Sequence, residues 1–131
     1  HHLGLQALCD EILLELSKGS ASRSQRTQLS ATKNLVQLFQ NSEASMIEHK
    51  LEQLCEPLKQ LLLLCEAPTF ALTCEGLRIL VVRLGCKSSP LVLPLLTLLI
   101  DHCSCASAAS VIGHYAHATA CTVLQHINNH D

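Results

Sequence analysis

Two leucine-saturated blocks, one directly after the other, constrain the fold of this chain more than any other feature. The first extends from Leu51 to Gly85 and the second from Pro90 to Ile127. Each block has an apolar first segment, a short turn that is polar or contains proline, and a second apolar segment with smaller residues mixed in. Because the apolar side chains recur at helical spacing, each block predicts a pair of helices joined by a short connection.

The composition favours an all-α fold for the whole chain. Hydrophobic residues make up 48% of the 131 residues, but aromatic residues only 2%, so leucine, isoleucine, valine, alanine and cysteine must fill the core. Strands draw more on β-branched and aromatic residues, and five glycines with four prolines are too few for a many-stranded sandwich. We expect one helical domain over residues 1–131. The start at His1 and His2, without a methionine, suggests a fragment of a larger protein.

Apolar periodicity predicts about six helices, arranged as three antiparallel pairs in a right-handed stack. Their expected ranges are residues 3–18, about 25–40, from Ser42 or Ser45 to about 65, 69–84, about 90–102 and about 107–128. Ser45 and Glu48 have capping-box spacing at the start of the third helix. Pro57 should kink or split that helix, because it has no amide donor. Gly85 should end the fourth helix.

A serine-rich segment, residues 19–25, is expected to be a flexible loop between the first two helices. No acidic residue occurs between Glu15 and Glu43, whereas four basic residues lie there, at Lys18, Arg23, Arg26 and Lys33. A solvated linker is the simplest interpretation. The alternative is a regulatory loop that binds phosphate or is phosphorylated.

Charge and hydropathy argue against two classes of partner. The net charge of −2 gives no overall field that attracts nucleic acid or an anionic membrane surface. The most apolar stretch, residues 91–100, is interrupted by Pro94 and Thr97 and is too short to span a bilayer, so we expect a buried helix.

The eight cysteines are expected to be reduced rather than paired. Cys9, Cys55, Cys65 and Cys74 fall within the apolar helical periodicity, where a free cysteine behaves as a small hydrophobic side chain. Secreted disulfide scaffolds usually lack the leucine core that this chain has. We therefore expect a cytoplasmic or nuclear protein, with a disulfide framework as the alternative.

Residues 51–85 and 90–127 resemble armadillo or HEAT-type helical repeats. Segments 51–64 and 91–99 are similar to the leucine-rich first helix of such a repeat, and segment 71–80 to its second helix. The two blocks start roughly 39 residues apart, within the range of these repeats. The resemblance implies a stacked helical scaffold that binds other proteins and covers about two-thirds of the chain.

One position departs from the armadillo pattern. Armadillo domains that hold extended peptides use an asparagine in the second helix, and Val82 occupies the matching position here, beside Arg83. The last helix offers Gln125 or His126 instead. We therefore expect a flatter helix-face interface rather than a peptide-gripping groove.

A cluster of histidines and cysteines near the C-terminus is the main candidate for metal chemistry. His102, Cys103 and Cys105 precede a helix on which His114, His117 and Cys121 share one face. Cysteine and histidine are the preferred zinc ligands, so a zinc-stabilised domain that uses Cys103, His114, His117 and Cys121 is an alternative. The simpler interpretation, which we prefer, is a partly exposed face without a metal. The same cluster offers the only cysteine–histidine pair for catalysis, Cys103 or Cys105 with His114 or His117, but no enzyme motif accompanies it.

Three basic residues near the end of the fourth helix, Arg78, Arg83 and Lys87, are the predicted partner-binding residues. They could simply be solvated cations that suit the helix C-terminus, but arginine is also enriched at protein interfaces. The sequence thus predicts a non-catalytic interaction or scaffold module, without cofactor, that binds a partner helix or a short motif. A trafficking-type helical adaptor is a second alternative, and self-association is compatible with the exposed apolar faces of an excised repeat.

Overall fold

The computed structural model describes residues 7, 10, 21–64, 66–105 and 110–128, and this part of the chain is all-α, without strands. The predicted first helix, residues 3–18, lies almost entirely outside the described residues and stays a prediction. The described helices are α2 (Ala21–Asn41), α3 (Ala44–His49), α4 (Leu51–Leu63), α5 (Ala67–Leu84), α6 (Ser89–Cys105) and α7 (Val111–Asn128), with a 3-10 helix, η1 (Gly85–Ser88), between α5 and α6.

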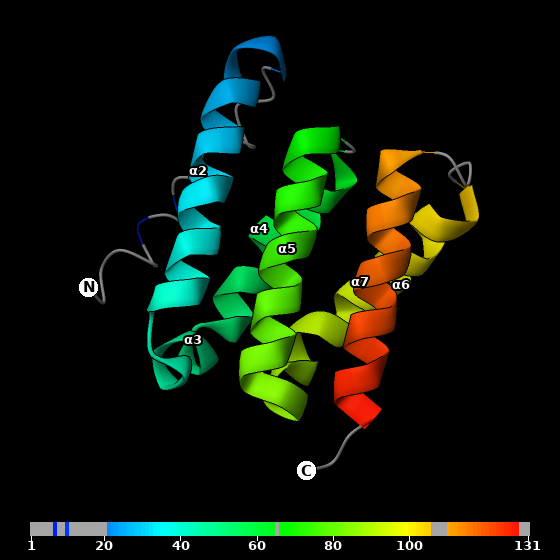
Figure 1. Cartoon of the computed structure of the whole chain (residues 1–131). Coiled ribbons are helices and arrows are strands. Elements are labelled where there is room, and N and C mark those ends of the chain that lie inside the picture. The colour runs from blue at the N-terminus through cyan, green and yellow to red at the C-terminus, as the bar shows by residue number, and fades with distance from the viewer. Residues whose placement is uncertain (1–6, 8–9, 11–20, 65, 106–109, 129–131) are drawn as a thin grey trace.

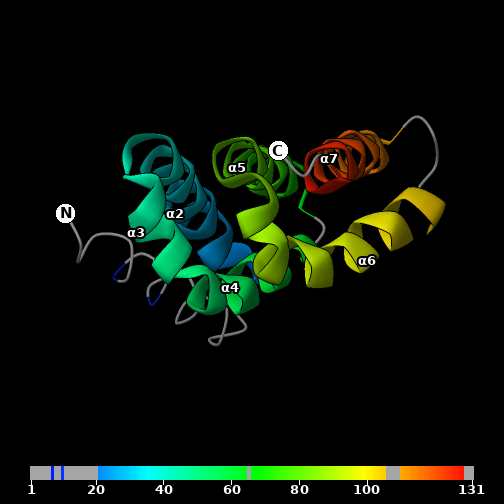
Figure 2. The same cartoon turned by 90° about the horizontal axis from the view of Figure 1, so that it is seen from below.

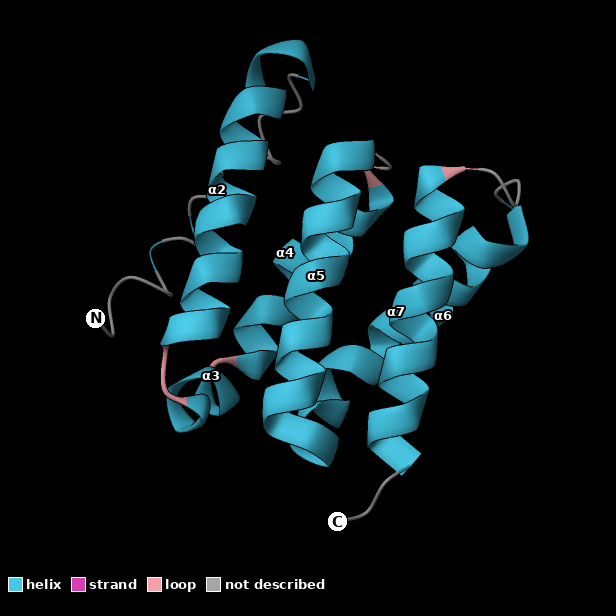
Figure 3. Cartoon of the chain, in the orientation of Figure 1, coloured by secondary structure: helices cyan, strands magenta, loops and turns pink. Residues whose placement is uncertain are grey.

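The helices form two layers. Helices α2, α5 and α7 lie side by side and run in the same direction, each from the top of Figure 1 to the bottom. Helices α4 and α6 form the second layer, seen below the first in Figure 2, and bring the chain back to the start of α5 and α7. Figure 3 shows how short most of the connections between the described helices are. Several helices therefore pack as antiparallel pairs, which is compatible with a helical-repeat fold.

Helix α5 is the centre of this arrangement, because it packs against α2 on one side and α7 on the other. The predicted apolar face of α5 is confirmed: Phe70, Cys74, Leu77, Val81 and Leu84 are all buried. Around it the core is almost wholly aliphatic, as the composition predicted. The largest of the fully buried side chains are Phe39, Phe70, Leu35, Ile47, Leu54, Leu58, Leu61, Leu62, Leu77 and Leu80.

Helix α2 begins earlier than expected. The prediction placed a loop over residues 19–25, but residues 21–25 belong to α2. Residues 19 and 20 lie outside the described part of the chain. The serines in this stretch suggested a loop. The helix preference comes from the residues among and after them, Ala21, Arg23, Gln25 and Arg26, and it outweighs the weaker preference of the serines.

The predicted third helix is divided, but not at its proline. A break at Lys50 (φ −107°, ψ 7°) separates α3 from α4, and α4 continues through the buried Pro57. Only one backbone hydrogen bond is lost, the one that an N–H at position 57 would donate to the carbonyl of Gln53. The capping-box prediction at Ser45 is wrong: Glu43 is the N-cap of α3 and makes no side-chain capping bond, and Ser45 lies within the helix.

The boundaries around α5, α6 and α7 agree closely with the predictions. Gly85 ends α5 with φ +59° and ψ −136°, a backbone conformation that glycine adopts without a steric penalty. Helix α6 continues to Cys105, three residues beyond its expected end. At the start of α7 the side chain of Ser110 accepts a hydrogen bond of 2.9 Å from the amide of Gly113, as an N-cap serine does.

The segment Ala67–Cys103 is apolar enough by length and composition to cross a membrane, with a mean hydropathy of 1.6. In the fold it is not one helix, because Gly85 and η1 divide it into α5 and α6. Both helices contribute to the core, and 39% of the most apolar window is buried. Core helices of globular proteins pass the same compositional test, so this feature is weak support for a membrane span.

Candidate partner-binding groove

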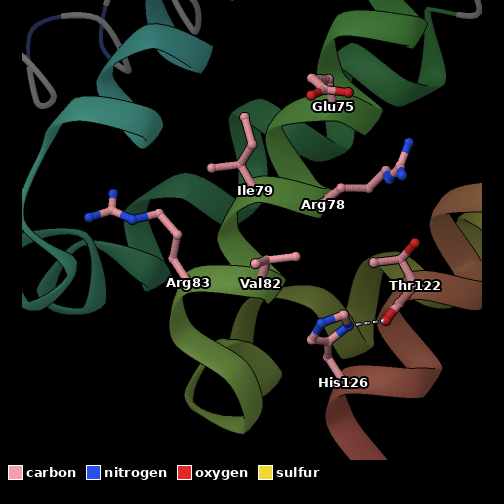
Figure 4. Close-up of a pocket in the computed structure, with 7 residues that line it drawn as sticks. All are labelled: Glu75, Arg78, Ile79, Val82, Arg83, Thr122 and His126. Atoms are coloured by element: carbon pink, nitrogen blue, oxygen red, sulfur yellow. Dashed lines mark hydrogen bonds between the residues drawn. The ribbon is translucent and has the colours of Figure 1, made fainter.

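A groove of about 380 Å³ lies between α5 and α7. Figure 4 shows the seven residues that line it: Glu75, Arg78, Ile79, Val82, Arg83, Thr122 and His126. Five of these come from α5 and two from α7. We call this hollow the α5–α7 groove. It contains two of the three predicted partner-binding residues, Arg78 and Arg83.

The floor of the groove is aliphatic and open to solvent. Val82 is 61% exposed, the highest value among the large exposed hydrophobic side chains of the described residues. Ile79, one turn earlier, is half-buried and packs against the core. The register of α5 explains this exposure: Leu77, Val81 and Leu84 turn toward the core, which leaves Val82 on the opposite side of the helix. An exposed valine in a groove is a potential anchor for an apolar partner side chain.

Arg78 is the free positive charge of the groove. It lies one turn before Val82 on α5, and its guanidinium forms no salt bridge or hydrogen bond with any described residue. Glu75, three residues earlier, also lines the groove and is exposed, but no ion pair joins it to Arg78 within the described part of the chain. The groove therefore presents an unpaired guanidinium beside an exposed apolar surface.

Arg83 has a structural partner, unlike Arg78. Its Nη1 donates a hydrogen bond to the backbone carbonyl of Phe39, across the interface between α5 and α2. In Figure 4 its side chain points away from α7 toward α2. The carbonyl of Phe39 is in the last turn of α2, where it has no amide partner within the helix and where the helix dipole favours a cation. Arg83 thus caps α2 as well as lining one end of the groove.

The groove residues on α7 are polar, and their side chains form hydrogen bonds with the backbone of α7 itself. His126 Nδ1 lies 3.0 Å from the carbonyl oxygen of Thr122, and the Thr122 hydroxyl donates a 3.0 Å hydrogen bond to the carbonyl of Ala118. These bonds hold both side chains against α7. Gln125, which the sequence offered as an alternative to His126, is exposed but does not line the groove.

Lys87 is not part of the groove. It lies in η1, beyond the end of α5, where it is exposed and sits in the last turn of the short helix. The structure therefore brings together Arg78 and Arg83 but separates Lys87 from them. Its role as a partner-binding residue stays a prediction.

The histidine and cysteine cluster is only partly assembled. Cys121 Sγ lies 3.9 Å from His117 Nε2, and Cys121 is close enough to Cys103 to help raise the pKa of the Cys103 thiol. His114 instead packs edge-to-face on Tyr115, with ring centroids 5.7 Å apart, and His102 packs in the same way on Phe70 at 5.1 Å. Among the described residues no group of three or more metal-ligating side chains is arranged to hold an ion.

The thiols with perturbed titration are poorly suited to nucleophilic chemistry. Burial raises the pKa of Cys74 to about 11, although the neighbouring Thr119 hydroxyl and Arg78 act in the opposite direction. Burial and the nearby Cys121 also raise the pKa of Cys103. A catalytic thiolate requires a lowered pKa. The side chain of Cys105 lies outside the described part of the structure.

A second hollow, of about 260 Å³, lies where the first half of α2 meets the start of α5. Arg26, Leu29, Glu66, Pro68 and Thr69 line it. It presents one charge of each sign. Arg26 is the one basic residue among the described residues that line it.

Comparisons with known proteins identify no relative. No protein-family model, no curated protein and no solved structure matches this chain.

The sequence did not point to the whole groove. Arg78 and Arg83 were predicted, and Val82 was singled out by the armadillo resemblance, but Glu75, Ile79 and Thr122 were not. His126 was noted only as a substitute for the missing asparagine. The α5 residues of the groove could have been identified from their spacing. Residues 75, 78, 79 and 82 follow the pattern i, i+3, i+4 and i+7, which places them on one face of a helix.

Proposed function

We propose that this domain is a non-catalytic protein-interaction module of an intracellular protein, and that its partner binds in the α5–α7 groove. One observation carries the proposal: an exposed aliphatic surface at Val82 adjoins the unpaired guanidinium of Arg78. Interfaces typically combine an apolar centre with arginine and a polar rim. The polar rim here consists of Glu75, Thr122 and His126.

The arrangement of the helices supports a finer proposal about architecture. Helices α4 and α5 form one antiparallel pair, α6 and α7 the next, and the second members of both pairs lie in one layer with α2. This is the organisation expected of a HEAT- or armadillo-like stack, in which neighbouring second helices build a continuous binding surface. The α5–α7 groove is the seam between two such second helices.

The test is capture of partners by the domain from a cell lysate, compared across matched single variants. Arg78→Glu and Val82→Glu change the groove at exposed positions and should leave the fold intact. Lys59→Glu reverses an exposed charge on α4, in the other layer, and is the control. Circular dichroism checks that all variants are folded.

We expect one set of proteins to be captured by both the unaltered domain and the Lys59→Glu variant. Neither Val82→Glu nor Arg78→Glu should capture this set. The same set of captured proteins with all four forms would contradict it, because no partner would then use the groove.

A further inference from the structure

The two principal contacts of the α5–α7 groove are one helical turn apart. Val82 is four positions after Arg78 on α5, which corresponds to a rise of about 6 Å along the helix axis. Both line the groove, and Figure 4 shows them on the same side of α5, with Ile79 close by. A partner that uses both contacts must carry complementary groups at about the same spacing.

The charge of the partner follows from the charge of the groove. Arg78 has no salt-bridge partner within the described residues, whereas the guanidinium of Arg83 points away from α7 to the carbonyl of Phe39. Among the described residues that line the groove, Glu75 is the only acidic one. A carboxylate at Arg78 would be attracted by this guanidinium, which can bind a carboxylate through two parallel hydrogen bonds. A basic group at the same place would be repelled.

The shape of the groove favours a helix as the bound form. It lies between two helices that run side by side in the same direction, and a helical segment can rest its apolar face along such a seam. On a helix, side chains three or four residues apart occupy neighbouring positions on one face. Their spacing therefore matches the spacing from Arg78 to Val82.

We propose that the α5–α7 groove binds a short amphipathic helix that places a carboxylate on Arg78 and an aliphatic side chain, three or four residues away, on Val82 and Ile79. This inference rests on the proposed function and adds the chemistry of the partner. Glu75 then disfavours a second acidic residue one turn beyond the first. The preferred ligand is thus a segment with one acidic residue near its aliphatic anchor, rather than a continuous acidic run.

The test uses peptide display with a library of helix-forming peptides about fourteen residues long, selected on the whole domain. Binders are then measured by fluorescence anisotropy against the unaltered domain, Val82→Glu, Arg78→Glu and the control Lys59→Glu. We expect selected peptides to share an aspartate or glutamate three or four residues from a leucine, isoleucine or valine. Arg78→Glu should weaken them about tenfold or more, because it replaces attraction with repulsion.

A charge exchange makes the test specific to Arg78. Replacing the acidic residue of a selected peptide by lysine should weaken its binding to the unaltered domain and restore binding to Arg78→Glu. Restoration cannot result from loss of folding, because a poorly folded variant would bind neither peptide.

The outcomes separate the two proposals. Peptides that need Val82 but carry no acidic residue, or that bind Arg78→Glu unchanged, would overturn the proposed ligand and leave the groove as a binding site. Selected peptides whose binding Val82→Glu does not change would overturn both. Self-association of the domain that Val82→Glu abolishes would identify a second copy as the occupant and also overturn the proposed ligand.

Discussion

Gly76 on α5 lies against the ring of Phe39 on α2, so closely that a Cβ atom at position 76 would be 3.2 Å from Cδ2 of Phe39. The same atom would be 3.5 Å from Cγ2 of Val36. Phe39 is completely buried and has little room to move. The absence of a side chain at Gly76 therefore sets how closely α2 approaches α5.

We expect Gly76→Ala to destabilise the domain by about 1 kcal/mol. Alanine improves the helix preference by about 1 kcal/mol, but overpacking a filled core costs about 1–3 kcal/mol, so the packing effect should exceed the gain. Urea denaturation measures the change in the free energy of unfolding. In a Phe39→Leu background, which leaves more space, the same substitution should be neutral or stabilising. Equal destabilisation in both backgrounds would show that the contact with Phe39 is not the cause.

Arg83→Met should also destabilise the fold, by about 1 kcal/mol. The substitution keeps the apolar part of the side chain but removes the hydrogen bond to the carbonyl of Phe39 at the end of α2. Hydrogen bonds to charged groups contribute about 1.5–3 kcal/mol, and solvent can replace part of this contact because Arg83 is exposed. Lys87→Met, at an exposed position in η1, is the control and should change stability by less than about 0.5 kcal/mol. Equal effects of the two substitutions would argue against a capping role for Arg83.

Gly85→Ala should cost about 1 kcal/mol for a purely conformational reason. Gly85 has φ +59°, and a Cβ there would meet no atom within 4 Å, so no clash contributes. With ψ −136°, this backbone lies outside the αL region, in a part of φ/ψ space that costs a residue other than glycine roughly 1–3 kcal/mol. Asparagine has no advantage here, because its tolerance of positive φ is confined to αL, so Gly85→Asn should lose about as much stability as Gly85→Ala in the same denaturation experiment. A clearly smaller loss for Gly85→Asn would indicate that the end of α5 rearranges.

Cys74 should make the stability of the domain depend on pH in the alkaline range. Burial raises its pKa from 9.0 to about 11, so between these values the folded state retains a proton that the unfolded state releases. The stabilisation is complete below pH 9 and is lost as the pH rises toward 11, by at most roughly 3 kcal/mol. Comparison with Cys74→Ala isolates this contribution from other titrating groups. Parallel stability curves for the two proteins between pH 8.5 and 11 would contradict the expectation.

Much of the fold follows from the spacing of apolar residues. The face of α5 from Phe70 to Leu84 was predicted correctly, because its pattern is long and regular and ends at a glycine. The break at Lys50 was not predicted, because apolar residues continue across it in helical register and no glycine marks it. At Pro57 the expected split does not occur, since the buried contacts of α4 outweigh the loss of one hydrogen bond. The other expectation for Pro57, a kink in the helix, stays a prediction.

The α5–α7 groove was predictable only in part. Arg78 and Arg83 are recognisable as a basic pair on one helix. Their different roles are not, because the partner of Arg83 is a backbone carbonyl forty-four residues earlier. Thr122 and His126 become groove residues only because α7 lies beside α5, a relationship that local sequence patterns do not contain.

The most direct test of the central claim is site-specific photo-crosslinking from inside the groove. A photoreactive amino acid replaces Val82 in one form of the protein and Lys59, on the other layer, in a second form. Both forms are irradiated in cells and their covalent adducts are compared. The proposed function predicts adducts with a partner protein from position 82 that are absent from position 59 and that Arg78→Glu removes. Adducts from position 59 alone, or the same adducts from both positions, would contradict a partner-binding site in the α5–α7 groove.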